Sequence, residues 1–172
     1  HLGTRIHDMR KEFMEALAPI CSAQYKAISS GDEQVQLLYE SQLTASPLSE
    51  LLARSLEKDR LLQYTTQGIH KDDLNMQIDG YPIKRFGSQG QQKSYLIALK
   101  FAQFQFMERK LAGTPLLLLD DIFDKLDEHR VAHIISLVNQ ELFGQIFISD
   151  THAQRTEAIV KKIHQSYAVL SL

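Results

Sequence analysis

The sequence predicts an α/β protein with a mostly parallel sheet, preceded by a mainly helical lobe. Apolar residues recur at helical spacing through much of residues 1–66. From Gly68 onward, short apolar runs typical of buried strands alternate with longer helical patterns. The clearest run, Leu116 to Leu119, is a continuous aliphatic stretch expected of a strand buried on both faces. We therefore expect a helical lobe over 1–66 and an α/β unit over 67–172.

The helical lobe is predicted from two segments joined by a turn at Gly31–Asp32 and a short strand over 34–40. The apolar residues of the first segment recur at helical spacing: Ile6, Met9, Phe13, Leu17 and Ile20. The second helix is expected to begin near Ser46, with Pro47 at its first position. Its stripe comprises Leu48, Leu51, Leu52, Ser55 and Leu56. Nothing in this lobe indicates chemistry, so we expect a packing or spacer element.

The α/β unit is predicted as a series of strands and helices. Leu74, Met76 and Ile78 alternate with polar residues, which indicates a strand, and Asp79–Gly80 marks a turn. The later elements follow from apolar runs and helical spacing: a helix over 88–111 ended by Gly113 and Pro115, a helix with Val131, Ile134, Ile135 and Val138 on one side, strands over 146–148 and 167–170, and a helix over 153–163.

Composition limits the class of protein. The chain has 172 residues, a net charge of −2 and 44% hydrophobic residues, as expected of a globular protein without a general attraction to polyanions. Cys21 is the only cysteine, which excludes an internal disulfide and fits a cytoplasmic location. No apolar run approaches a membrane span, so we expect no membrane association. Because the chain begins at His1, we expect it to be a fragment.

Two adjacent carboxylates, Asp120 and Asp121, follow the Leu116–Leu119 strand. Ligands of open α/β sheets bind at the carboxyl ends of strands, where a carboxylate can hold Mg²⁺ and a second one can orient a water for attack on phosphorus. The alternative is that one of these residues caps the next turn. Asp127 follows shortly after, and its position alone predicts an N-cap for the helix that carries Val131.

A serine–glycine turn, Gly87 to Ser94, precedes the long apolar helix. Ser88 and Gln91 have the spacing of a capping box, which is a purely structural interpretation. Gly90 costs about 1 kcal/mol relative to alanine in a first helical turn, and a bare backbone there lets a phosphate approach the N–H groups. The same segment nearly matches a phosphate-binding P-loop, but Gln92 stands where that pattern requires glycine.

The order of these motifs resembles the C-terminal half of an ABC-type ATPase head. Residues 88–91 look like the ABC signature, 116–121 like Walker B with its catalytic carboxylate, 125–127 like the D-loop, and 149–152 like the switch-histidine segment. Within that superfamily the chain resembles the RecF family of bacterial repair ATPases. The stretches that carry this resemblance are Gly68-Ile69-His70-Lys71-Asp72-Asp73-Leu74, Gly87 to Lys93, and Asp120-Asp121.

The resemblance implies a role for each matching residue. Asp120 would bind Mg²⁺ through water, Asp121 would polarise the attacking water, and His152 would be the catalytic switch histidine. For His152 the alternative is a purely structural role, which is common for a lone histidine after a strand. Ser88, Gly90 and Gln91 would contact the γ-phosphate of ATP bound to a partner head, and Asp127 would link the two sites. Gln89 replaces a glycine of the common signature, and Asp121 stands where most ABC proteins have Glu, which shortens its reach. The family's Walker A loop is absent, so this chain alone is expected not to turn over ATP.

The RecF resemblance also implies ATP-driven homodimerisation of heads, DNA binding near junctions of single and double strands, cooperation with recombination mediator proteins, and a part in replication and the SOS response. Basic residues outnumber acids between 81 and 110: Lys84, Arg85, Lys93, Lys100, Arg109 and Lys110 stand against Glu108. This excess fits phosphate contact, but the sequence alone favours an ordinary solvated helix face, since basic residues suit a helix C-terminus. Two other functions stay open: a non-catalytic ABC-shaped interaction domain, and a small NTPase with 87–94 as its P-loop.

Overall fold

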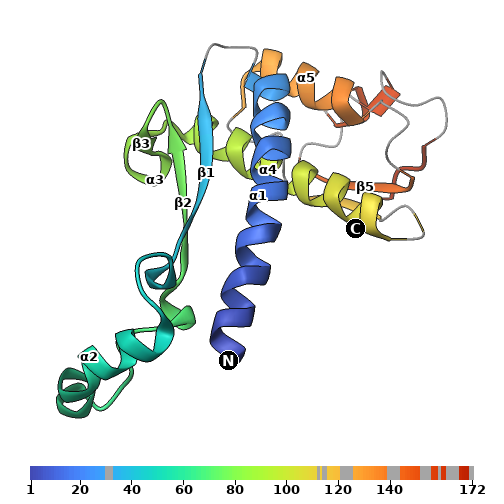
Figure 1. Ribbon diagram of the computed structural model, residues 1–172. Coiled ribbons are helices and arrows are strands. Elements are labelled where there is room, and N and C mark those ends of the chain that lie inside the picture. The colour runs from blue at the N-terminus through green and yellow to red at the C-terminus, as the bar shows by residue number, and fades with distance from the viewer. Residues whose placement is uncertain are drawn as a thin grey trace.

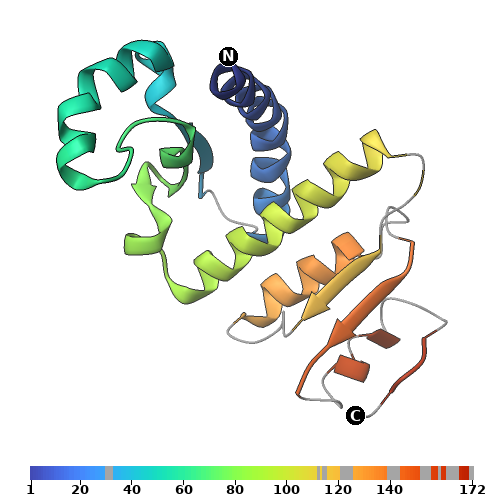
Figure 2. The ribbon, with the colours of Figure 1, turned by 90° about the horizontal axis from the view of Figure 1, so that it is seen from below.

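The computed structural model describes residues 1–29, 33–111, 113, 116–120, 126–138, 144–151, 156–158, 160–161 and 167–170. A long first helix, α1 (Leu2–Ser29), crosses a second long helix, α4 (Gln89–Lys110), near the middle of the molecule (Figure 1). An arm of strands on one side of this crossing ends in the helix α2 (Leu48–Leu62). A short parallel sheet lies on the other side, next to α4 and α5 (Glu128–Val138) (Figure 2).

The helix α1 packs inward along a different face from the predicted one. Its buried residues are His7, Met14, Leu17, Cys21, Tyr25 and Ile28. Of the predicted series only Leu17 is buried, whereas Met9 is 61% exposed and Phe13 is 38% exposed. The inward face follows a seven-residue spacing that includes a histidine and a cysteine, so counting only the most apolar residues selected a neighbouring face. This inward face packs mainly on α4 and also contacts α5.

Three antiparallel strands form the first sheet, in the order β1 (Val35–Glu40), β2 (Asp73–Ile78) and β3 (Tyr81–Pro82). The turn between β2 and β3 is the predicted Asp79–Gly80, and both residues have positive φ, at 49° and 81°. Such a pair matches the twist of a tight hairpin. Since β1 pairs with β2 and α1 packs on α4, the first 66 residues share a sheet and a core with the rest of the chain. The division at residue 66 stays a prediction.

The second predicted helix exists, but its apolar stripe is largely open to solvent. It begins at Leu48, with Pro47 as the residue before its first turn. Ser55 is its only buried residue, while Leu52 and Leu56 are 39% and 48% exposed. The helix lies at the end of the arm, away from the crossing of α1 and α4 (Figure 1). Its leucines therefore add little to the core of this chain.

A buried carboxylate joins α1 to the arm. Asp72, within the Gly68–Leu74 motif, accepts hydrogen bonds from Arg10 Nη1 at 2.8 Å and from the Tyr39 hydroxyl at 2.6 Å. Burial alone raises the pKa of Asp72, but the hydrogen bonds from Tyr39, Ser41 and Arg10 outweigh it and lower the pKa below its usual value. One arginine from α1 and one tyrosine from β1 are thus held by the same side chain. This part of the motif serves to hold the arm against α1.

The parallel sheet contains β4 (Leu117–Asp120) and β5 (Ile146–Ser149), in register from Leu117 opposite Ile146 to Asp120 opposite Ser149. Leu117 and Leu119 are buried, but Leu118 is 72% exposed. The prediction of burial on both faces is therefore wrong for this chain by itself, because the face of β4 that carries Leu118 is open to solvent. Residues 167–170, predicted as a strand, have no regular secondary structure.

The predicted helix over 153–163 is helical at 156–158 and 160–161, and its other residues lie outside the described part. Within the described part of the chain, no helix combines the length and the apolar character that crossing a bilayer requires.

Candidate functional site

The serine–glycine turn begins a helix of 22 residues, α4, with a complete capping box. The Ser88 hydroxyl accepts the Gln91 backbone N–H at 3.2 Å, and the Gln91 side-chain carbonyl accepts the Ser88 backbone N–H at 2.8 Å. The capping box predicted from the spacing is confirmed. The P-loop interpretation of residues 87–94 is wrong, because the helix already begins at Gln89 and the short helix α3 (Ile83–Phe86), not a strand, precedes the turn.

The turn keeps hydrogen-bond donors for a ligand. The first N–H groups of any helix have no partner within it. Here the capping box uses the N–H of Gln91, and in the described residues no acceptor meets the N–H groups of Gln89 and Gly90. The Ser88 hydroxyl accepts one hydrogen bond and can still donate its own proton. A phosphate group would therefore find two amides and one hydroxyl at this helix end.

Gly87 brings α3 and α4 close together. A Cβ atom at this position would lie 2.6 Å from Ile83 Cγ1 and 2.7 Å from the Ile83 carbonyl oxygen. Both distances are shorter than real side chains tolerate, and the carbonyl belongs to the backbone. The Gly87 N–H donates to that same carbonyl at 2.8 Å. The chain can thus turn directly from α3 into the Ser88 cap only with glycine here.

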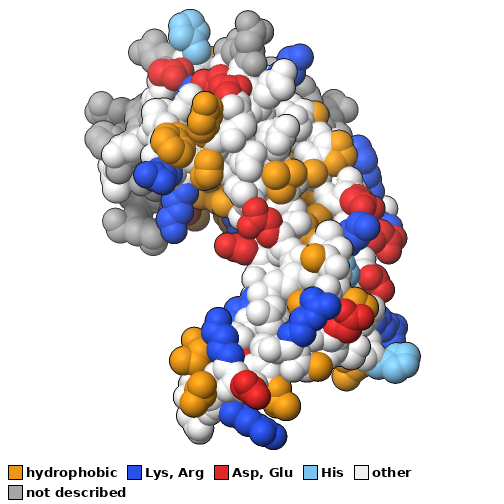
Figure 3. All heavy atoms as spheres, turned by 60° about the vertical axis from the view of Figure 1, so that its left-hand side comes forward, with side chains coloured by type: hydrophobic (Ala, Val, Ile, Leu, Met, Phe, Trp, Pro, Cys, Tyr) orange, Lys and Arg blue, Asp and Glu red, His pale blue; other side chains and the backbone are white. Residues whose placement is uncertain are grey.

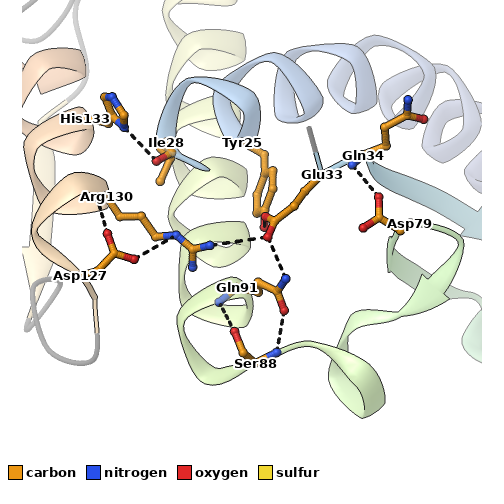
Figure 4. A network of polar contacts seen from close by, with 10 residues as sticks. All are labelled: Tyr25, Ile28, Glu33, Gln34, Asp79, Ser88, Gln91, Asp127, Arg130 and His133. Carbon is orange, nitrogen blue, oxygen red and sulfur yellow. Dashed lines mark hydrogen bonds and ion pairs between the residues drawn. The ribbon is translucent and has the colours of Figure 1, made fainter. Parts of the chain in front are cut away.

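The turn is connected to the rest of the molecule through Glu33 (Figure 4). Gln91 Nε2 donates to Glu33 Oε1 at 2.8 Å, and the Tyr25 hydroxyl donates to Glu33 Oε2 at 2.6 Å. Tyr25 is fully buried in the core. Burial, followed by the hydrogen bond to the Glu33 carboxylate, raises the pKa of Tyr25, so the hydroxyl keeps the proton that it donates.

Asp127 caps α5, as predicted. Its Oδ1 accepts the Arg130 backbone N–H at 2.9 Å, and this hydrogen bond is the main reason why the pKa of Asp127 is lowered. The Arg130 side chain points toward both acids: its Nε lies 3.5 Å from Asp127 Oδ2, and its Nη2 lies 3.7 Å from Glu33 Oε1. Figure 4 shows Arg130 between the two carboxylates. The predicted D-loop residue and the predicted signature are thus joined through Glu33 and Arg130.

Asp120 lies at the carboxyl end of β4, where the sequence placed a Mg²⁺ ligand, and its side chain is exposed. The Ser149 hydroxyl, opposite it on β5, donates a hydrogen bond to Asp120 Oδ1. Just after β5, the Thr156 hydroxyl donates to Asp150 Oδ2 at 2.6 Å. The residues that the structure describes contain no group of three or more His, Cys, Asp or Glu side chains arranged to hold a metal ion.

The structure brings some predicted residues together and leaves others apart. Ser88, Gly90, Gln91 and Asp127 share one connected cluster, whereas no described hydrogen bond or ion pair links Asp120 to it. Asp121 and His152 lie outside the described residues. Sequence reasoning missed Glu33, Arg130 and Tyr25. Little in the sequence indicates a role for these residues, since Glu33 merely follows a predicted turn and Arg130 is an ordinary basic residue in a first helical turn.

Known proteins match almost the whole of this chain. No protein-family model matches the chain. A DNA replication and repair protein RecF from Flavobacterium johnsoniae is 57% identical over 170 residues, which cover 99% of this chain and 47% of that protein. The RecF of Parabacteroides distasonis is 49% identical over 167 residues, 97% of this chain and 46% of that protein. This chain matches RecF along its whole length. The resemblance inferred from the motifs is confirmed, and the chain spans about half the length of these curated relatives.

Solved structures agree with the RecF match. The recombination mediator protein RecF-ATPrS in the RecFOR pathway superposes with a TM-score of 0.72 at 27% identity, covering 88% of this chain and 42% of that chain. The RecF-ATP structure superposes with a TM-score of 0.71 at 26% identity, and the match covers 88% of this chain and 42% of that chain. A structure of SMC ATPases gives 0.62 at 15% identity over 96% of this chain and 82% of that one, which shows the fold alone. The predicted class, the C-terminal half of an ABC-type head, is confirmed.

Proposed function

We propose that this chain forms the signature-bearing part of an ATP-switched head in a RecF-type protein that acts on DNA. The observation that carries the proposal is the helix end at Ser88, with its two open amides and its hydroxyl. The RecF relatives and the RecF-ATP structure support it. In this proposal the turn binds the γ-phosphate of ATP held by a second head. The head that carries the turn thereby responds to the nucleotide of its partner.

The chemistry at the phosphate follows from charge and position. An anion at a helix N-terminus is stabilised by the N–H groups and by the helix dipole. The Gln89 and Gly90 amides and the Ser88 hydroxyl supply neutral donors, so binding needs no buried counter-charge at this end. The Gly90 position leaves room for close approach of the phosphate. The turn therefore suits a phosphate that arrives with a partner rather than one held permanently.

Asp120 is the proposed Mg²⁺ ligand. Mg²⁺ prefers hard oxygen ligands, and an exposed carboxylate beside the Ser149 hydroxyl at the ends of two parallel strands provides such oxygens. When bound, the ion would neutralise charge on the phosphates. Asp121, the next residue, is proposed to accept a proton from the attacking water, and His152 to assist it. A non-catalytic head would keep the Ser88 turn and lose this step.

DNA and protein partners are proposed for the complete protein. The name shared by the relatives, DNA replication and repair protein, supports DNA binding, and mediator proteins of recombination and a second RecF head are the expected partners, in the cytoplasm. Lys84, Arg85, Lys100, Arg109 and Lys110 are exposed. Figure 3 shows basic and acidic side chains interspersed over one face, not a single basic patch. We therefore assign DNA contact to no particular residue.

The proposal is tested by Ser88→Arg in the complete protein. The arginine would obstruct a partner's phosphate, so ATP should still bind to each monomer while ATP-driven dimerisation is lost. Loss of the cap alone reduces stability by about 0.5–2 kcal/mol. A matched control is Ser41→Ala, which removes another serine cap, from the Leu43 N–H, away from this turn. Sedimentation with and without ATP decides: if Ser88→Arg dimerises as well as Ser41→Ala does, the turn is only a helix cap.

A further inference from the structure

We propose that Glu33 is a positioning residue that couples the signature turn to the first turn of α5. Glu33 belongs to neither segment, since it lies between α1 and β1. The inference rests on the proposed function, because it gives Glu33 a part in the same phosphate site. The Glu33 side chain reaches no phosphate donor directly, so it acts through Gln91 on one side and Arg130 on the other (Figure 4).

The two carboxylate oxygens of Glu33 have different tasks. Oε2 accepts the Tyr25 hydroxyl at 2.6 Å, and Tyr25 is fully buried, so this contact anchors Glu33 to the core. Oε1 is then held where it meets Gln91 Nε2 at 2.8 Å and Arg130 Nη2 at 3.7 Å. Hydrogen bonds to an ionised acceptor are roughly twice as strong as neutral ones. One anchored carboxylate thus fixes donors from two helices, α4 and α5.

The carboxylate also decides which way the Gln91 amide faces. An amide has a donor end and an acceptor end, and the cap needs the acceptor end toward the Ser88 N–H. Because Glu33 can only accept when ionised, it holds the NH₂ end of Gln91 toward itself. A flipped amide would place an oxygen against the carboxylate and an NH₂ group against the Ser88 N–H. Glu33 therefore keeps the Ser88 N–H occupied and leaves the Gln89 and Gly90 N–H groups for a ligand.

The second connection runs through Arg130. Its guanidinium lies between Glu33 and Asp127, and its side chain is 14% exposed against 25% for Glu33. Its own backbone N–H is the group that Asp127 caps. A displacement of the Ser88 turn would thus move Gln91 and the Glu33 carboxylate bound to it. Through the ion pairs of Arg130, the displacement would extend to Asp127. This is how contact with a partner's phosphate would reach the segment proposed to link the two sites.

A simple structural contact predicts something different from a positioning residue. Loss of a structural contact lowers the stability of the protein, but the molecules that stay folded bind ATP and dimerise as wild type does. Loss of a positioning residue loosens the Ser88 turn and impairs the ATP-driven step at unchanged ATP binding by the monomer. Gln105→Ala is the matched control, because Gln24 Nε2 donates to Gln105 Oε1 at 3.3 Å, an α1–α4 contact remote from the turn in sequence.

The first measurement is hydrogen exchange at the Ser88 amide in the complete protein without nucleotide. Glu33→Ala should speed this exchange about tenfold or more, the effect of losing a hydrogen bond that a charged group supports. Gln105→Ala should leave it unchanged. Since ATP is absent, this result does not depend on the proposed function. Equal exchange at Ser88 in wild type and Glu33→Ala would overturn the role assigned to Glu33.

The second measurement is ATP-driven dimerisation by sedimentation. Wild type and Gln105→Ala should dimerise with ATP, and Glu33→Ala should not, although its monomer binds ATP as wild type does. If wild type itself stays monomeric with ATP, the proposed function fails instead. If Glu33→Ala does not fold, Glu33→Gln and Arg130→Gln replace it: each removes the ion pair, and each should weaken dimerisation while Gln105→Ala does not. Dimerisation equal to that of the control contradicts the inference.

Discussion

The two ends of the proposed nucleotide machinery differ in how completely this chain builds them. At the Ser88 turn, side chains from α1, the α1–β1 connection, α4 and α5 hold one another in a continuous network. At the end of β4, Asp120 is exposed, and the Ser149 hydroxyl is its hydrogen-bond donor among the described residues. The turn is therefore held by side chains from several elements, while the end of β4 leaves the Asp120 carboxylate exposed.

This difference predicts two kinds of substitution. Changes at the Ser88 turn should lower stability and association together, because the same hydrogen bonds serve both. Changes at the end of β4 should alter the chemical step and leave stability almost untouched, because the Asp120 side chain is exposed and, among the described residues, is bonded to the Ser149 hydroxyl.

The largest effect is expected from Asp121→Asn in the complete protein. The substitution keeps the shape and removes the charge that would accept a proton from water. General-base catalysis typically contributes roughly 10²–10⁴-fold, so single-turnover hydrolysis should fall by that factor while nucleotide binding persists. Rapid-quench measurement with labelled ATP gives the rate. A rate within a few-fold of wild type would remove Asp121 from the chemical step and favour the non-catalytic alternative.

A smaller effect is expected on the free energy of unfolding, which should respond to changes at the Ser88 turn but not at the end of β4. Gln91→Ala removes the acceptor of the Ser88 N–H and the donor to Glu33, and should lower the free energy of unfolding by about 1–3 kcal/mol. Asp120→Asn keeps an oxygen for the Ser149 hydroxyl, and should stay within about 0.5 kcal/mol of wild type. Urea denaturation of both variants makes the comparison. Equal losses would show that the β4 end is as integral to the fold as the turn.

The smallest effect concerns pH and Asp127. The hydrogen bond from the Arg130 N–H lowers the pKa of Asp127 below its usual value of 3.8, so the carboxylate contributes stability above that pH. This contribution is lost as the pH falls through the lower, folded-state pKa. Asp127→Asn keeps a good N-cap without a titrating charge. The gap in melting temperature between the two proteins should be small at neutral pH and close below about pH 4. A gap that widens on acidification contradicts this assignment.

The sequence predicted well what depends on local chemistry. The Ser88–Gln91 capping box, the Asp127 cap and the Asp79–Gly80 turn each follow from a few adjacent residues, and the structure has all three. The strands β2 (Asp73–Ile78), β4 (Leu117–Asp120) and β5 (Ile146–Ser149) were predictable to within about one residue, because apolar alternation and short aliphatic runs mark them. These features need no knowledge of distant neighbours.

The failures concern contacts between distant segments. The inward face of α1 was misplaced because His7 and Cys21 pack inward, while Met9, a more apolar residue, stays exposed. Burial of β4 on both faces was expected from its composition, yet Leu118 is exposed in this chain. Glu33 and Arg130 are 97 positions apart by their numbering, and no periodicity relates them. Their meeting depends on how α1, α4 and α5 pack together.

The central claim is that the Ser88 turn serves the nucleotide of a second head, and mixing two inactive proteins tests it most directly. Complete protein with Ser88→Arg keeps Asp120 and Asp121 but has a blocked turn, and complete protein with Asp121→Asn keeps the turn but lacks the carboxylate. If the turn acts on the partner's ATP, a mixed dimer contains one intact site, and hydrolysis should return on mixing although each variant alone is inactive. If each turn acts on its own head's ATP, the mixture contains no intact site. Hydrolysis that stays absent, in a mixture shown to form mixed dimers, would contradict the claim.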